Sequence, residues 1–147
     1  MKFEFSAGGI VFKKERNQVK ILVSQHSQHH GWVFPKGLIG DHIKGEKKED
    51  TALREVEEEG RVKSKIVSKT GSNDYIIWDK LQKKKIIKKV TFFLMEYLGE
   101  SNLKYYDVEV VLEREWMSYE EATEKLAFDS EKILLRKAKN RLDSRKI

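Results

Sequence analysis

Three glutamates between residues 54 and 59 have the side chains and the spacing needed to hold a metal ion. Glu55, Glu58 and Glu59 lie three and four residues apart, so a helix would present them on one face. Carboxylates gathered in this way repel one another unless a cation lies among them. Their hard oxygen atoms suit Mg²⁺ or Mn²⁺. The stretch therefore predicts a divalent-metal site, and the alternative is a solvated helix crossed by salt bridges.

An arginine and a further glutamate accompany this cluster. Glu46 precedes Arg54 by eight residues, which is about two turns if the helix begins early enough. A guanidinium group favours a planar carboxylate that accepts two parallel hydrogen bonds. We therefore expect Glu46 to pair with Arg54.

The full pattern resembles a known family signature. It runs from Gly40 through Glu46 to Arg54-Glu55, then one apolar residue, one free position, and Glu58-Glu59. This spacing resembles the Nudix box of a large family of pyrophosphohydrolases that act on nucleoside-diphosphate-linked substrates. Other segments resemble the family in the same order along most of the chain: SAGGIVF, FPKG, VTFFLMEYL and EWMSYEEATEKL. FPKG and the WMSYEEA segment resemble small members related to diadenosine tetraphosphate hydrolases.

The resemblance implies a fold and an activity. The expected fold is of the α/β (α+β) class, a Nudix-type α/β/α sandwich with a mixed sheet between helices, forming one domain over residues 1–147. The expected activity is metal-dependent hydrolysis of a phosphoanhydride, with Mg²⁺ or Mn²⁺ as cofactor and a dinucleoside polyphosphate or nucleoside triphosphate as substrate. The alternatives are an RNA 5′ pyrophosphohydrolase, a diphosphoinositol phosphatase, and a non-catalytic nucleotide- or RNA-binding module. The intact carboxylates favour an enzyme.

The resemblance also implies roles for individual residues. The expected metal ligands are the carboxylates of Glu55, Glu58 and Glu59 and the backbone carbonyl of Gly37. Arg54, held by Glu46, would orient the cluster. Glu55 is a candidate general base, and Glu58 is the ligand most expected to be essential. Lys36 lies beside the expected metal site in the sequence, so it could contact a substrate phosphate.

The chain departs from the family pattern at two positions. The Pro-Lys-Gly turn that normally supplies the box glycine ends at Gly37, nine residues before Glu46. Gly40 meets the usual spacing, but we expect Gly37 to border the metal. The family places glycine where this chain has Arg61, and a left-handed conformation there would cost about 1 kcal/mol. We expect Gly60 to cap the helix instead. Neither departure removes a carboxylate.

Composition narrows the class of protein. With 39% apolar and 37% charged residues, 147 residues are enough for one soluble domain with a buried core. The absence of cysteine excludes disulfides and thiolate metal sites. No apolar stretch approaches 18 residues and MKFEFSAGG lacks a signal-peptide core, so we expect a cytoplasmic protein without a membrane segment. The expected oligomeric state is a monomer or a homodimer. The net charge of +6 favours anionic partners such as a polyphosphate, and RNA is a further possibility.

Hydrophobic periodicity and turn residues predict the elements that must position the cluster. Strands are expected over residues 2–6, 9–13, 19–24, 32–34, 62–69, 75–78, 90–98 and 107–116. Turns are expected over residues 71–74 and 81–85. The box helix is expected over residues 48–59, with Ala52, Leu53 and Val56 facing the sheet. Ser118 should cap a helix over residues 119–126. The last helix should begin at residues 128–130 and bury Ile133, Leu134 and Ala138.

Other notable residues have two interpretations each. Tyr75 is a candidate nucleobase contact, and Trp78 and Phe128 could also stack on a base, although aromatic side chains in strands more often belong to the core. His26, His29 and His30 could suggest a metal cluster, but we interpret them as solvated loop histidines. Five lysines within residues 83–89 are expected to be solvated strand-edge residues, with RNA or phosphate binding as the alternative.

Overall fold

The fold is built on a seven-stranded mixed sheet in a computed structural model that describes residues 1–40, 43–103 and 111–145. The strands are β1 (Lys2–Glu15), β2 (Gln18–His26), β3 (Trp32–Val33), β4 (Lys36–Leu38), β5 (Val62–Asp79), β6 (Lys84–Glu100) and β7 (Val111–Ser118). Neighbouring strands follow the order β3-β2-β1-β6-β5, while β4 pairs with β1 and β7 pairs with β2. Only the β1–β6 pair is parallel among the described strand pairs.

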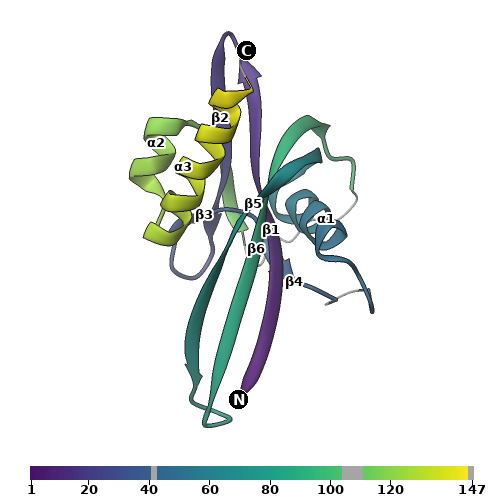
Figure 1. Ribbon diagram of the computed structural model, residues 1–147, viewed down its shortest axis with the longest axis vertical. Coiled ribbons are helices and arrows are strands. Elements are labelled where there is room, and N and C mark those ends of the chain that lie inside the picture. The colour runs from purple at the N-terminus through teal and green to yellow at the C-terminus, as the bar shows by residue number, and fades with distance from the viewer. Residues whose placement is uncertain (41–42, 104–110, 146–147) are drawn as a thin grey trace.

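Helices cover both faces of this sheet. They are α1 (Lys48–Gly60), α2 (Tyr119–Lys125) and α3 (Asp129–Ser144). Figure 1 shows α1 on one side of the sheet and α2 with α3 on the other. The predicted α/β/α sandwich with a mixed sheet is therefore confirmed. None of the helices among the described residues is long and apolar enough to span a membrane.

The side chains of β1 point alternately to the two faces of the sheet and contribute to both halves of the core. Ile10 and Phe12 join the cluster beneath α2 and α3, whereas Ala7 and Val11 join the cluster beneath α1. Successive side chains of a strand point to opposite faces, so one strand supplies both layers. The central strand thereby fixes where α1, with its carboxylates, lies relative to α3.

Two predicted interruptions in strands are wrong. Residues 2–15 form one strand rather than two, and β5 runs without a break through the turn predicted at residues 71–74. Register shifts near residues 63, 67 and 70 accommodate the irregular part of β5. Gly71 serves packing instead of a turn, because a Cβ there would lie 2.9 Å from a methyl group of Leu134 on α3.

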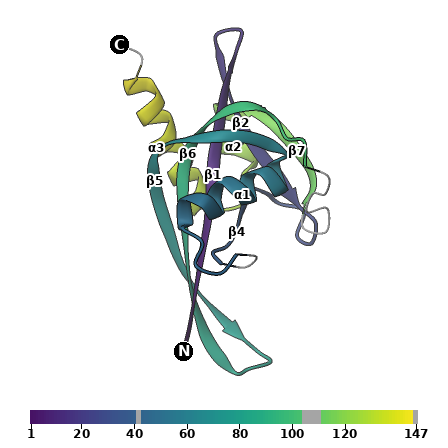
Figure 2. The ribbon, with the colours of Figure 1, turned by 90° about the vertical axis from the view of Figure 1, so that its right-hand side faces the viewer.

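The short elements between the helices also differ in part from expectation. Residues 36–38, expected as a turn, form the short strand β4 on β1. The last strand begins at Val111 in the described chain, and residues 107–110 of its predicted range lie outside the described residues. The tight β5–β6 turn is confirmed, with Asp79 Oδ1 accepting hydrogen bonds from the backbone N–H groups of Leu81 and Gln82. Figures 1 and 2 show this hairpin and the start of β1 extending beyond the helices.

The C-terminal helices correct one prediction about the core. Ser118 Oγ accepts a hydrogen bond from Glu121 N–H, which confirms the predicted cap of α2. In α3, Leu134 and Ala138 are buried as expected, but Ile133 is 54% exposed and Leu135 takes its place. The buried stripe of α3 therefore begins one turn earlier, at Glu131, and advances at helical spacing to Leu142.

Candidate active site

Helix α1 is fixed to the sheet by small apolar residues and presents its carboxylates on another face. Ala52 and Val56 are fully buried, and Leu53 packs against the same cluster, which confirms the predicted apolar stripe. The first turn of α1 is anchored by Thr51, whose hydroxyl donates a 2.7 Å hydrogen bond to Glu46 Oε1. The loop before the helix is therefore tied to the helix itself.

Glu46 and Arg54 form the predicted bidentate pair. Arg54 Nε donates to Glu46 Oε2 and Arg54 Nη2 donates to Glu46 Oε1, both at 2.9 Å. The Glu46 side chain is only 4% exposed. Hydrogen bonding from Arg54 lowers the pKa of Glu46 to about 2, although burial opposes the shift. The same hydrogen bonds raise the pKa of Arg54, so both groups remain charged over the physiological range.

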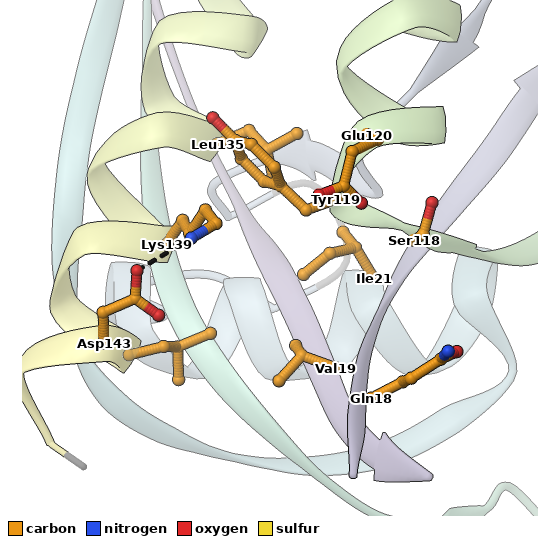
Figure 3. Close-up of a pocket in the computed structure, with 10 residues that line it drawn as sticks. Gln18, Val19, Ile21, Ser118, Tyr119, Glu120, Leu135, Lys139 and Asp143 are labelled. Carbon is orange, nitrogen blue, oxygen red and sulfur yellow. Dashed lines mark hydrogen bonds and ion pairs between the residues drawn. The ribbon is translucent and has the colours of Figure 1, made fainter. Parts of the chain in front are cut away.

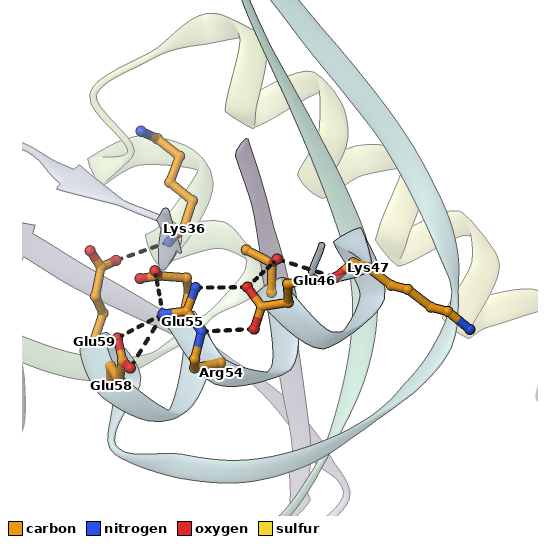
Figure 4. A network of polar contacts seen from close by, with 8 residues as sticks. Lys36, Glu46, Lys47, Arg54, Glu55, Glu58 and Glu59 are labelled. Carbon is orange, nitrogen blue, oxygen red and sulfur yellow. Dashed lines mark hydrogen bonds and ion pairs between the residues drawn. The ribbon is translucent and has the colours of Figure 1, made fainter. Parts of the chain in front are cut away.

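The remaining nitrogen of Arg54 lies between two of the predicted metal ligands. Nη1 donates to Glu55 Oε1 at 2.9 Å and lies 3.2 Å from Glu58 Oε2. Figure 4 shows the guanidinium surrounded by Glu46, Glu55 and Glu58. One positive charge thus faces three carboxylates, which leaves a net negative site that favours further cations.

The Pro35–Gly37 turn supplies the other side of this site. The backbone N–H of Lys36 donates a 2.9 Å hydrogen bond to Glu59 Oε2. A Cβ at position 37 would overlap the Glu55 carboxylate, so a larger residue there would displace this carboxylate from its present position. Gly40, by contrast, lies at a positive φ of 76° and contributes a backbone hydrogen bond to Glu46. Gly37 is therefore the glycine that borders the cluster.

The donor set fits a hard divalent cation. Glu55 and Glu59 are buried carboxylates, Glu58 is partly exposed beside them, and Gly37 brings backbone against Glu55. Oxygen donors of this kind are those that Mg²⁺ and Mn²⁺ prefer. Among the described residues, no three acidic or histidine side chains converge on one point as they stand. Arg54 Nη1 occupies the space between Glu55 and Glu58, so these two carboxylates must turn from Arg54 to share an ion.

The end of α1 differs from the prediction that Gly60 caps the helix. Gly60 belongs to the helix, and Arg61 adopts the left-handed conformation with φ 60° and donates its N–H to Glu57 O. Gly60 instead allows close packing, because a Cβ there would lie 2.8 Å from Leu22 of β2. Arg114 Nη1 donates to the Gly60 carbonyl at 3.1 Å. A cation from β7 thus stabilises the negative end of a helix that has no basic residue in its last turn.

A cavity of about 740 Å³ lies on the α3 side of the sheet. Its wall combines residues from β2, the β2–β3 turn, β4, β5, β6 and the start of α3. Its aromatic and ionisable lining residues are His26, His29, Lys36, Asp74, Tyr75, Phe128 and Glu131. The volume is within the range of small-molecule sites. Lys36 and Tyr75, the two predicted substrate contacts, both line it, whereas Trp78 is exposed and is not part of the wall.

The loop histidines are more ordered than expected. The rings of His26 and His29 stack with centroids 4.3 Å apart, and His29 meets Phe128 edge-on at 5.8 Å. Nδ1 of His26 accepts a hydrogen bond from Gln28 N–H, and Nδ1 of His29 accepts one from Gly31 N–H. Burial is the largest of the causes that lower the pKa of His26, with His29 and Lys36 adding to it. These rings build the cavity wall, and His30 is exposed outside it.

Glu131 also lines the cavity, and sequence reasoning missed it. Its side chain is 4% exposed, and Oε1 accepts a 2.9 Å hydrogen bond from Phe34 N–H. Burial raises the pKa of Glu131 to about 7, against opposing effects of the Phe34 N–H and Lys36. A usable signal was present in the sequence. Glu131 lies three and four residues before Leu134 and Leu135, so it occupies an apolar-face position that a solvated glutamate would avoid.

A second hollow, of about 260 Å³, lies away from the carboxylates. Figure 3 shows it between β2, α2 and α3, with Lys139 beside Asp143 and Tyr119. Lys139 Nζ lies 2.8 Å from Asp143 Oδ2 and 5.2 Å from the centre of the Tyr119 ring. Lys139 and Asp143 of this hollow therefore pair with each other, and none of the residues that line the hollow belongs to the α1 carboxylate cluster.

Comparisons with known proteins agree with this arrangement. The NUDIX domain family matches residues 2–137. The Mycobacterium tuberculosis (strain CDC 1551 / Oshkosh) protein MutT4 is 33% identical over 147 residues, which cover 95% of this chain. The chain spans only 56% of the length of that relative.

Solved structures agree at the level of the fold. A C. elegans Ap4A hydrolase binary complex superposes with a TM-score of 0.67 at 20% identity, covering 96% of this chain and 98% of that one. The NUDIX domain of Shewanella oneidensis NrtR, in complex with ADP ribose, gives a TM-score of 0.63 at 22% identity, with 97% and 89% covered. At these identities the likeness shows the shared fold alone.

Proposed function

Because this chain belongs to the Nudix family, we propose that it hydrolyses a phosphoanhydride bond in a nucleotide with the help of a divalent metal ion. The expected substrates are dinucleoside polyphosphates and nucleoside triphosphates, and Mg²⁺ or Mn²⁺ is the expected cofactor. A nucleotide substrate is supported by two proteins that share this fold and whose names refer to nucleotides: the C. elegans Ap4A hydrolase and the NrtR domain in complex with ADP ribose. MutT4, the longer relative, supports family membership.

One observation carries the proposal: Lys36 joins the carboxylate cluster to the cavity. Its backbone N–H donates to Glu59, while its side chain lines the cavity. A nucleotide whose base enters the cavity would therefore extend its phosphates past Lys36 toward Glu55, Glu58 and Glu59. The Lys36 ammonium would attract those phosphates.

In this proposal the residues of the cluster have different roles. Glu55, Glu58 and Glu59, with the backbone of Gly37, would hold the metal. When bound, the ion supplies positive charge that neutralises the phosphate oxygens and makes the attacking water more acidic. Arg54, fixed by Glu46, would orient Glu55 and Glu58 before the ion binds, and both carboxylates would turn from Arg54 to hold it. Glu55 is the candidate base for the proton of the water, which attacks phosphorus while the P–O anhydride bond breaks and the leaving phosphate keeps the electron pair.

A product analysis across substrates tests the proposal. The panel contains diadenosine tetraphosphate, the nucleoside triphosphates, a 5′-triphosphate RNA and a diphosphoinositol, each with Mg²⁺, with Mn²⁺ and with a chelator. ATP plus AMP from diadenosine tetraphosphate, lost with chelator, is the expected result for an asymmetrically cleaving enzyme. Turnover of the RNA or the diphosphoinositol alone would move the substrate class. If no substrate of the panel shows metal-dependent turnover, the proposed hydrolase activity is refuted and a binding module is favoured.

A further inference from the structure

Glu131 has one carboxylate oxygen committed to the protein and one available to a ligand. Oε1 accepts the hydrogen bond from Phe34 N–H, which fixes the plane of the carboxyl group. Within the described part of the chain, Oε2 receives no hydrogen bond, and Glu131 lines the cavity. A buried carboxyl group that lacks a full set of partners is costly for folding. This cost suggests that Glu131 serves a ligand.

The surroundings of Glu131 suit a flat heteroaromatic ring. Tyr75 and Phe128 contribute partly exposed aromatic faces to the same cavity, and His29 contacts Phe128 edge-on. Aromatic faces of this kind stack on nucleobases of any sequence, so they provide affinity without choosing a base. Discrimination between nucleobases can then come from a single buried polar group in the cavity wall.

The other ionisable groups on this wall come from different elements. They are His26 on β2, His29 in the following turn, Lys36 on β4, and Asp74 and Tyr75 on β5. Lys36 is the one whose charge acts on Glu131, and it favours the ionised carboxylate. Since Glu131 is the only member of this set with a carboxyl group and nine-tenths burial, it is the most selective acceptor available.

We propose that Glu131 determines base specificity, its Oε2 accepting a hydrogen bond from the exocyclic amino group of a purine nucleotide. This inference rests on the proposed nucleotide-binding function of the same cavity. An ionised carboxylate only accepts hydrogen bonds, so it rewards a base with an amino donor. The protonated group instead donates, and a ring nitrogen of any purine can accept. Because burial raises the pKa of Glu131 to about 7, the preference for an amino group should increase as pH rises through neutrality.

Equilibrium binding of monophosphates tests this without hydrolysis. AMP is compared with purine riboside 5′-monophosphate, which lacks only the 6-amino group, and GMP with IMP, which lacks only the 2-amino group. Both members of a pair carry the same phosphate, so its titration cancels in the ratio of their dissociation constants. Calorimetry in chelator at about pH 6 and about pH 8 provides the ratios on either side of the Glu131 pKa.

For the wild-type protein we expect the amino-bearing member of one pair to bind about tenfold more tightly at the higher pH, as for a hydrogen bond to a charged group. The ratio should approach one at the lower pH. In Glu131→Gln the amide can keep the Phe34 hydrogen bond but offers a donor to the cavity, so its ratio should be near one at both values. The matched control is Asp129→Asn, which removes an exposed carboxylate of the same helix end outside the cavity wall and should behave as wild type.

Three results would overturn the inference: an unchanged ratio in Glu131→Gln, ratios near one in both pairs for the wild type, or no binding of any monophosphate. The substrate panel above decides the proposed hydrolysis separately. A protein that hydrolyses nucleotides but gives equal ratios refutes the role of Glu131 alone. A protein that shows the pH-dependent ratio but no hydrolysis would support the role of Glu131 in base specificity and refute the proposed hydrolase activity.

Discussion

The carboxylate cluster and the cavity are assembled in opposite ways. The cluster comes from one helix and the turn beside it, and its main contacts join residues one, four and eight positions apart, as between Arg54 and Glu46. The cavity is enclosed by strands and loops from across the chain, and the hydrogen bond between Phe34 and Glu131 spans 97 residues. The residues of the proposed metal site are therefore close together in the sequence, whereas those of the proposed nucleotide site are brought together only by the tertiary fold. This difference explains why the family can be inferred from a short stretch and the substrate cannot.

If the two regions have separate roles, variants of the cluster should affect turnover and variants of the cavity should affect substrate choice. The largest expected effect is at Glu58. Glu58→Gln should lower kcat by on the order of a thousandfold or more, about 4 kcal/mol, because the metal site loses a charged ligand. Steady-state kinetics with saturating Mg²⁺ measures it, and circular dichroism checks the fold. The matched control is Glu57→Gln on the same helix, whose carboxylate accepts a hydrogen bond from Ser101 outside the cluster. Equal losses in both variants would mean that the helix, and not the ligand, is damaged.

The second largest effect is expected at Glu131 in the cavity wall, on the free energy of unfolding. The folded-state pKa of Glu131 is about 7 against an ordinary value of 4.5, so the folded protein keeps a proton that the unfolded chain releases. The free energy of unfolding should therefore fall as pH rises from about 4.5 to about 7, and by about 3 kcal/mol in total. Glu131→Gln should remove this loss, so the stability of the variant should exceed that of the wild type increasingly across the same window. Urea unfolding at several pH values gives the difference, with Asp129→Asn as the control. A constant difference at all pH values would show that Glu131 does not titrate in this range.

At Tyr75 we expect a change in KM with little change in kcat, the opposite of the change expected at Glu58. Tyr75→Ala should remove one stacking face and raise KM by about tenfold, because base–aromatic stacking contributes about 1–3 kcal/mol. Turnover at saturating substrate should change little, since Tyr75 lies in the cavity and not in the cluster. Michaelis–Menten parameters for the best substrate of the panel separate the two effects. Trp78→Ala, an exposed strand residue outside the cavity wall, is the comparison. A fall in kcat for Tyr75→Ala with KM unchanged would break the division between the regions.

The smallest expected effect concerns the left-handed residue that ends α1. Arg61 holds φ at 60°, a conformation that glycine adopts without strain. Arg61→Gly should raise the free energy of unfolding by about 0.5–1 kcal/mol and leave kcat unchanged, because Gly60 and Arg114 keep their contact. Urea unfolding measures the gain. Destabilisation would indicate that the Arg61 side chain contributes more than its backbone costs.

Sequence reasoning worked where the interactions are close in the chain. The bounds of α1 and the apolar stripe through Ala52 and Val56 follow from helical spacing, and the Glu46–Arg54 pair follows from charge and distance along one element. It worked less well where neighbouring elements decide. Gly71 resembles a turn residue, but the ladder with β6 keeps the strand continuous and α3 requires the small residue. Glu131 went unnoticed because a charged residue suggests solvent, and only the fold places Phe34 N–H against it.

Manganese binding tests the central assignment most directly, because it needs neither a substrate nor turnover. Electron paramagnetic resonance titrations with Mn²⁺ compare the wild type, Glu58→Gln and Glu57→Gln. We expect the wild type and Glu57→Gln to bind Mn²⁺ equally and Glu58→Gln to bind it at least about tenfold more weakly. Equal affinity in all three proteins, or no binding to the wild type, would contradict the assignment of the α1 carboxylates as the metal site.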